Sequence, residues 1–141
     1  MTRLSHIEVD AAADDDSRMA ISDLLQDNAF TVPDIEGPYR LRLAMVDRRI
    51  AFAVTSAGDA REFHLSLGPF RQILKDYTQI CNALTEAQGR MPPNRIEAID
   101  MARRGIHNEG ARLLQERLDG KADVDLDTAR RLFTLLCAMQ R

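Results

Sequence analysis

The chain has 141 residues, of which 45% are hydrophobic, so it is long enough to bury a core as one domain without disulfides or metals. Its formal net charge of −3 is uneven, because the acidic excess lies in residues 1–36 and the remainder of the chain is net positive. No signal peptide, membrane span, CxxC or HExxH motif is found, so we expect a cytoplasmic protein with no membrane association, no metal and no cofactor.

Residues 1–36 are predicted to form an acidic, loosely packed segment. It begins with a short strand over residues 4–9, "LSHIEV", and continues as an acidic linker over Asp10–Asp16. Ser17 is a favoured N-cap for a short amphipathic helix, because Ala20, Ile21, Leu24 and Leu25 fall on one helical face. "TVPDIEGP", residues 31–38, is predicted to be a loop.

The hydrophobic period changes to two from Tyr39 onward. Hydrophobic residues alternate with polar ones on both sides of a polar turn at Asp47–Arg49 and again after a second turn at Ser56–Asp59. This pattern is typical of strands with one buried face and one solvated face. Residues 37–67 are therefore predicted to be a meander of antiparallel strands.

Helical spacing takes over after Gly68. Pro69 suits the first turn of a helix that ends near Gly89, with hydrophobic residues at i, i+3, i+4 and i+7. Asn94 and Asp127 are predicted to cap two later helices. Between these helices, "ADVDLD" predicts a short edge strand over residues 122–127. Cys81 and Cys137 fall in hydrophobic helical patterns and are expected to be buried free thiols.

The predicted fold is α+β and consists of a single domain, residues 1–141. A small antiparallel sheet of three to four strands, the meander of residues 37–67, would be covered on one face by a helical C-terminal half. That half, residues 68–141, would contain about four helices.

The segment "RRGIHNEG", Arg103–Gly110, has two interpretations. Arginines in a last helical turn, a glycine just beyond it and Asn108 as the next N-cap predict that one helix stops and another starts here. The alternative is one unbroken helix, which would have to tolerate Gly105 and Gly110 at about 1 kcal/mol each. We favour the break, which makes this segment an arginine-rich turn.

Charged and polar residues around this turn form the candidate site. Asp100 is within reach of Arg103 and Arg104 at i+3 and i+4, and two arginines of the last helix can join them. The group is either a structural ion-pair network or a patch that binds an anion, a nucleic acid or a protein partner. Its members are Asp100, Arg103, Arg104, His107, Asn108, Glu109, Arg130 and Arg131.

Several segments are similar to one known family: "GPYRL" (37–41), "KDY" (75–77), "IC" (80–81), "IEAIDM" (96–101), "RRGIHNEG" (103–110) and "DTARRLFTL" (127–135). They resemble UPF0262, an uncharacterised family of small alphaproteobacterial proteins, over about residues 37–139. The resemblance implies a soluble bacterial protein. It implies no activity, cofactor or catalytic residue.

Two classes of function remain open. The first is a non-catalytic cytosolic binding or regulatory module that meets a protein partner. The second is a small enzyme for an anionic substrate, with His107 and Glu109 as an acid–base pair. No nucleophile, phosphate-binding loop or metal set accompanies the histidine, so the first class is favoured. A protein partner is favoured over nucleic acid, because the pI is about 5.6 and the chain has no tryptophan for base stacking.

Overall fold

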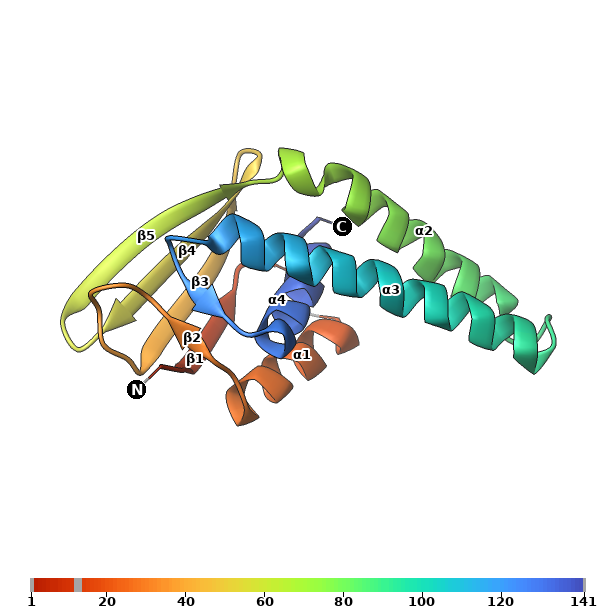
Figure 1. The fold of residues 1–141 in the computed structure, drawn as a ribbon, viewed down its shortest axis with the longest axis horizontal. Coiled ribbons are helices and arrows are strands. Elements are labelled where there is room, and N and C mark those ends of the chain that lie inside the picture. Colours follow the sequence, from red (N-terminus) through yellow and green to blue (C-terminus); the bar gives the residue numbers. More distant parts are fainter. Residues whose placement is uncertain (1, 12–13, 141) are drawn as a thin grey trace.

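The computed structural model describes residues 2–11 and 14–140, and it confirms the α+β class. Sheet and helices are arranged as shown in Figure 1. No helix in these two described ranges is sufficiently long and hydrophobic to cross a membrane. The elements in chain order are β1 (Leu4–Val9), α1 (Asp15–Gln26), β2 (Phe30–Thr31), β3 (Tyr39–Val46), β4 (Arg49–Ser56), β5 (Asp59–Ser66), the 3-10 helix η1 (Gly68–Phe70), α2 (Arg71–Ala87), α3 (Pro93–Leu118), β6 (Asp123–Val124) and α4 (Leu126–Met139).

The predicted meander is present as β3, β4 and β5, which pair antiparallel in chain order. The sheet is mixed and not wholly antiparallel as predicted, because β1 joins its edge parallel to β3. Adjacent strands linked by tight turns must run antiparallel, whereas β1 reaches β3 only after the chain has passed through α1, and such a crossover permits parallel pairing. The predicted short strand near residue 124 is found as β6. It pairs with β2, which begins just before the predicted loop.

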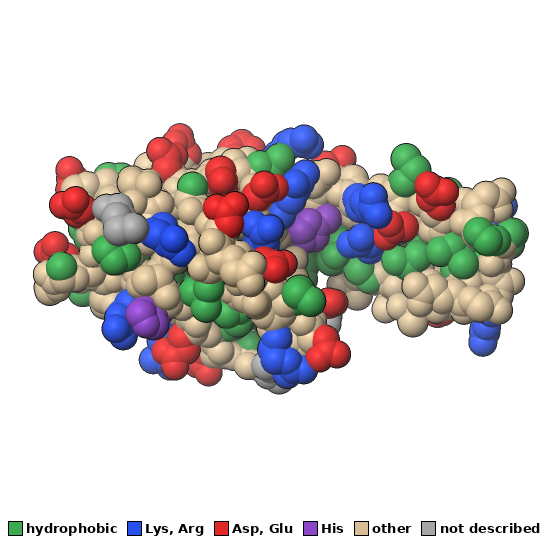
Figure 2. Space-filling view, turned by 90° about the horizontal axis from the view of Figure 1, so that it is seen from below, with side chains coloured by type: hydrophobic (Ala, Val, Ile, Leu, Met, Phe, Trp, Pro, Cys, Tyr) green, Lys and Arg blue, Asp and Glu red, His purple; other side chains and the backbone are tan. Residues whose placement is uncertain are grey.

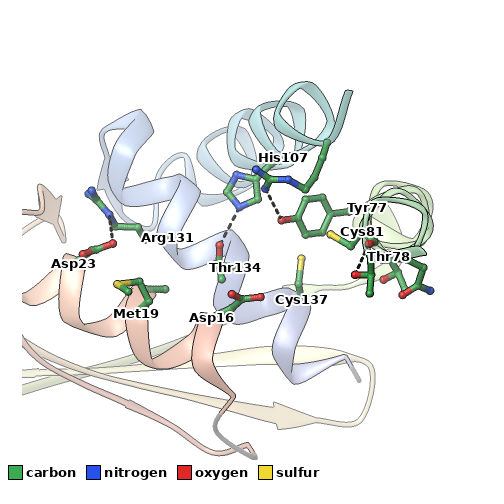
Figure 3. A pocket seen from close by; sticks show the side chains of 14 residues that line it. Asp16, Met19, Asp23, Tyr77, Thr78, Cys81, His107, Arg131, Thr134 and Cys137 are labelled. Atoms are coloured by element: carbon green, nitrogen blue, oxygen red, sulfur yellow. Dashed lines mark hydrogen bonds and ion pairs between the residues drawn. The ribbon is translucent and has the colours of Figure 1, made fainter. Parts of the chain in front are cut away.

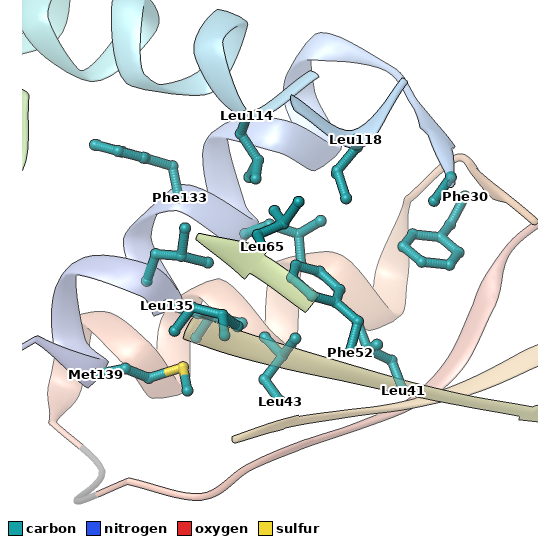
Figure 4. Packing of buried hydrophobic residues seen from close by; sticks show 14 of the residues in the cluster. Phe30, Leu41, Leu43, Phe52, Leu65, Leu114, Leu118, Phe133, Leu135 and Met139 are labelled. Carbon is teal, nitrogen blue, oxygen red and sulfur yellow. The ribbon is translucent and has the colours of Figure 1, made fainter. Parts of the chain in front are cut away.

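Hydrophobic residues from both halves of the chain fill one core, which lies between the sheet and the helices (Figure 4). Leu43 and Phe52 of the sheet, Leu114 of α3 and Phe133 of α4 are all fully buried. The N-terminal segment, predicted to pack loosely, contributes fully buried residues too: Leu4, Leu24 and Phe30. That prediction is corrected, because α1 packs on α4 and β1 pairs with β3.

Helices α2 and α3 form a projecting arm, defined here as residues 71–109. The two helices run antiparallel and extend beyond the sheet and the other helices (Figure 1). In α2 only Leu74 and Ala87 are buried, and the first buried residue of α3 is Gly110. The predicted helix near residues 69–89 is confirmed. Helix α2 packs along α3, and its hydrophobic residues repeat with coiled-coil spacing at Ile73, Tyr77, Ile80, Leu84 and Ala87.

The predicted helix break at Gly105 is wrong, because α3 is continuous from Pro93 to Leu118. The segment Arg103–Gly110 is therefore helix and not an arginine-rich turn. The part of α3 before this segment packs on α2 and the part after it on α4, so tertiary contacts override the local stop and start signals. One consequence is that α3, and not α2, is the longest helix.

The predicted N-caps are each displaced by two or three residues toward the N-terminus. Asp14 caps α1 and accepts a hydrogen bond from the Ser17 backbone N–H, and Asp125 caps α4 in the same way with Thr128. The helix predicted to begin after Asn94 begins at Pro93. Residues 12 and 13 of the predicted acidic linker lie outside the described residues.

Replacing Gly105 by alanine is expected to stabilise the protein by about 1 kcal/mol, the difference in helix propensity between the two residues. A Cβ atom built on Gly105 meets no atom within 4 Å, so the new methyl group should not clash. Urea unfolding monitored by circular dichroism measures the change. A loss of stability on Gly105→Ala would contradict the continuous, exposed helix at this position.

Candidate functional site

A pocket of about 670 Å³ lies between the arm, α4, which packs on α3, and α1, which packs on α4 (Figure 3). The surface is notched where the arm leaves the remainder of the molecule (Figure 2). Each of the four helices contributes side chains to the pocket. The ones used below are Asp16, Met19 and Asp23 of α1, Tyr77 and Asn82 of α2, Arg103 and His107 of α3, and Arg131 and Thr134 of α4.

His107 is held at the pocket by hydrogen bonding and ring packing. Its Nε2 lies 2.9 Å from Thr134 Oγ1, and that hydroxyl itself donates to the Arg130 carbonyl at 3.2 Å. The hydroxyl proton is thus engaged, so His107 Nε2 is the donor and Nδ1 carries the lone pair. The imidazole packs against the rings of Tyr77 and Phe133, with centroids 5.2 and 5.3 Å away.

The surroundings keep this imidazole uncharged. Burial lowers the pKa of His107 to about 4, and the positive charges of Arg103 and Arg130 act in the same direction. At neutral pH the ring is therefore a neutral donor. The lowered pKa makes it a weak base, so it is poorly matched to proton abstraction near pH 7.

Arg103 is fixed by partners at both ends of its guanidinium group. Its Nε donates to Asp100 Oδ1 at 2.9 Å, and its Nη1 donates to the Tyr77 hydroxyl at 3.4 Å. Arg104 pairs with the other oxygen of Asp100 at 2.9 Å. The hydrogen bond from Arg103 lowers the pKa of Asp100, and burial raises the pKa of Tyr77 to about 12. Asp100 is thus charged and the Tyr77 phenol protonated at neutral pH.

A second group of polar residues joins α3 to α4. Arg130 donates from Nε to Asn108 Oδ1 at 2.7 Å and from Nη1 to Asp127 Oδ1 at 2.8 Å. Next to it, Arg131 Nε lies 4.0 Å from Asp23 Oδ2 of α1 (Figure 3). The predicted cluster is thus divided between an arm group around Asp100 and an α4 group around Arg130, with His107 between them.

Glu109 belongs to neither group. It is exposed, and within the described ranges no hydrogen bond or ion pair joins it to His107. Two residues apart on a continuous helix, the side chains point to different sides. The acid–base pair on which the enzyme hypothesis rests is therefore not supported.

Sequence reasoning missed half of the pocket. Tyr77 was assigned only to the hydrophobic stripe of α2, and Thr134 and the α1 residues were not singled out. The one available signal was the tyrosine itself, because a hydroxyl within a buried stripe needs a polar partner. Arg103 occupies a position of α3 where the helical pattern favours a hydrophobic residue, so it too needed a polar partner. In the structure Arg103 donates a hydrogen bond to the Tyr77 hydroxyl.

Comparison with known proteins finds a match across nearly the whole chain. The model of the Uncharacterised protein family (UPF0262) matches residues 2–141. A UPF0262 protein of Paracoccus denitrificans (strain Pd 1222) is 56% identical, covering 97% of this chain and 94% of the relative. A UPF0262 protein of Cereibacter sphaeroides (strain ATCC 17025) is 54% identical, covering 99% and 98%, respectively. No solved structure matches.

Proposed function

The chain belongs to the Uncharacterised protein family (UPF0262), whose description assigns no activity, and from that premise we propose that it is a non-catalytic cytoplasmic module that binds a protein partner in the pocket beneath the arm. The observation that carries the proposal is the pocket itself, with walls from all four helices and with Arg103 and His107 already held in place. Polar groups fixed before binding lower the entropy lost on association.

The lining of the pocket favours a protein over other partners. Met19, which is 64% exposed at the α1 wall, offers a flexible hydrophobic contact, and Tyr77 and Asn82 stand opposite on α2. Methionine and tyrosine are enriched at protein interfaces. The carboxylates of Asp16 and Asp23 lie on the same wall as Met19 and would repel a phosphate backbone.

The state of His107 favours binding over catalysis. The imidazole donates to Thr134, is uncharged at neutral pH and lacks the carboxylate partner that a catalytic base would use for orientation. In a binding site the same neutral, ring-packed side chain is useful, since it shapes the wall and adds no charge that a partner would have to neutralise.

Asn82→Arg is expected to reduce the amount of partner captured from native cytosol at least tenfold relative to the unchanged protein. The longer charged side chain would fill the pocket from the α2 side. Gln79→Arg is the matched control, being an exposed polar residue of the same helix that does not line the pocket. Tagged protein, quantitative mass spectrometry of the captured material and parallel nuclease-treated samples give the measurement.

Two results would contradict the proposal. If both arginine variants capture the same material as the unchanged protein, the pocket is not the binding surface. If nuclease treatment removes the captured material, the partner is a nucleic acid. Circular dichroism of each variant verifies that a loss of capture is not a loss of folding.

A further inference from the structure

The two cysteines of the chain lie far apart in the sequence and come together in the structure. Cys81 of α2 and Cys137 of α4 both line the pocket beneath the arm, and both are thiols. Figure 3 shows their side chains directed into the space between these two helices. Helices α2 and α4 each pack on α3, and this shared neighbour brings the two thiols to one pocket.

The two thiols differ in exposure. Cys137 is buried, with 7% of its surface exposed, as expected from the sequence. Cys81, which was also expected to be buried, is only half-buried on the α2 wall of the pocket. Oxidation of cysteine follows solvent access, so a small oxidant that enters the pocket reaches Cys81 first.

The polar network of the pocket extends to Cys81. Arg103 donates to the Tyr77 hydroxyl oxygen, and Cys81 follows Tyr77 by one helical turn of α2. Burial raises the pKa of Tyr77 to about 12, and the neighbouring Cys81 acts in the same direction. The phenol therefore keeps its proton at neutral pH and can donate it in a hydrogen bond to negative charge that develops on the Cys81 sulfur.

We propose that Cys81 and Cys137 form a reversible disulfide across the pocket, with Cys81 as the thiol that a peroxide oxidises and Cys137 as the thiol that resolves it. Disulfides in a reducing compartment are usually transient and redox-sensing. The bond is therefore expected to form under oxidative stress and to be reversed by cellular thiols, through thiol–disulfide exchange.

The chemistry takes place in two steps. The Cys81 sulfur attacks one oxygen of hydrogen peroxide, so an S–O bond forms, the O–O bond breaks, and the released hydroxide takes the thiol proton to become water. The Cys137 sulfur then attacks the sulfenic sulfur of Cys81, so an S–S bond forms, the S–O bond breaks, and a second water leaves with the Cys137 proton. The two thiols lose two electrons, and the peroxide gains them.

The bond would close the pocket. A disulfide holds its sulfur atoms about 2.05 Å apart and its Cα atoms within about 7 Å, so it would draw the α2 wall toward α4. Helix α2 is suited to such a movement, because only Leu74 and Ala87 of its residues are buried. A loss of partner binding on oxidation rests on the proposed function, whereas the disulfide itself does not.

Peptide mapping of the full chain tests the disulfide. Folded protein is treated with hydrogen peroxide, alkylated with N-ethylmaleimide and digested with trypsin, which leaves the cysteines on separate peptides, residues 76–90 and 132–141. Mass spectrometry should find these peptides joined in protein that runs as a monomer on a non-reducing gel, and a reductant should separate them. Cys137→Ser should leave Cys81 as a sulfenic acid that dimedone traps, and Cys81→Ser should react with peroxide about tenfold more slowly.

The double variant Cys81→Ser with Gln79→Cys is the matched control. It keeps a thiol on α2 but moves it to an exposed position that does not line the pocket. Its disulfide with Cys137 should form at least about tenfold more slowly than that of the unchanged chain, because the new thiol does not share the pocket with Cys137. Circular dichroism verifies that each variant is folded before its oxidation is compared.

Three results would overturn the disulfide. Peroxide could join the cysteines of different chains, the control variant could pair with Cys137 as fast as the unchanged chain does, or the oxidised protein could melt at a lower temperature than the reduced protein. A cross-link that fits the fold should instead raise the melting temperature, because it constrains the unfolded chain.

Capture of a partner tests the closure separately. Oxidised protein should capture less partner than reduced protein, and reduction should restore capture. If Asn82→Arg reduces capture but oxidation does not, the pocket is the binding surface and its closure is wrong. If neither change affects capture, the proposed function has failed, and the disulfide is still judged on the protein alone.

Discussion

Gly110→Ala is expected to destabilise the protein by about 3 kcal/mol, although the same substitution at Gly105 in the same helix is expected to stabilise it. A Cβ atom on Gly110 would lie 2.3 Å from Cζ of Phe133, well inside van der Waals contact. The Phe133 ring is fully buried and packs edge-on against Tyr77 and His107, so it has little room to turn away. The gain in helix propensity, about 1 kcal/mol, offsets only part of this overpacking.

Chemical denaturation of the two alanine variants side by side measures the contrast, because the change in amino acid is identical and only the position differs. The double variant Gly110→Ala with Phe133→Leu tests the cause. If the clash with the ring is responsible, the two substitutions should be coupled by about 1 kcal/mol or more, with a smaller loss than the sum of the single changes. Equal stabilisation by alanine at both glycines would show that α3 does not lie on Phe133.

Lowering the pH from 6.5 to 4 is expected to remove about 2 kcal/mol of stability through His107 alone. The pKa of this imidazole is about 4 in the folded protein and 6.5 in an unfolded chain. Below pH 6.5 the unfolded state therefore binds a proton that the folded state does not, and unfolding becomes easier as the pH falls. The two pKa values alone would imply a larger loss of stability, and solvent around the half-buried ring reduces that loss.

His107→Phe isolates this effect, because phenylalanine keeps a ring between Tyr77 and Phe133 but cannot titrate. The difference in unfolding free energy between pH 7 and pH 4.5 should be smaller in this variant than in the unchanged protein. Asp100 does not interfere, since its pKa is lowered from 3.8 and it titrates below this window. Identical pH profiles for His107→Phe and the unchanged protein would contradict a buried, neutral imidazole.

Local patterns predicted the parts of the fold that local contacts determine. The strands from Tyr39 to Ser66 pair through tight turns, so alternation along the chain was sufficient to place them. The parallel pairing of β1 with β3 was not predictable in this way, because it joins residues far apart in the chain and leaves no periodic signal. The predicted helix break at Gly105 was wrong for a related reason. Cap signals are local, whereas the contacts that keep α3 continuous come from α2 and α4.

Helical spacing predicted some contacts among the candidate residues, but it did not predict the pocket. Asp100 does hold Arg103 and Arg104, as spacing on a helix implies. Arg130 donates to Asn108 across two helices, whereas the sequence indicated only that Arg130 and Arg131 could join the cluster. The sequence did not indicate that α1 lines the pocket. Asp16 and Met19 reach the same pocket as His107 only because α1 packs on α4.

Helix α4 has a further consequence for how the protein acquires its structure during synthesis. Leu132, Phe133, Leu135 and Leu136 are fully buried and lie between the sheet, α1 and α3. Until these residues are synthesised, the earlier elements lack a large part of the hydrophobic surface on which they pack, so the strands and α1 remain partly exposed on their inner faces. Such a waiting chain is prone to aggregate. Cells that synthesise this protein rapidly should therefore depend on chaperones that shield nascent chains until α4 emerges from the ribosome.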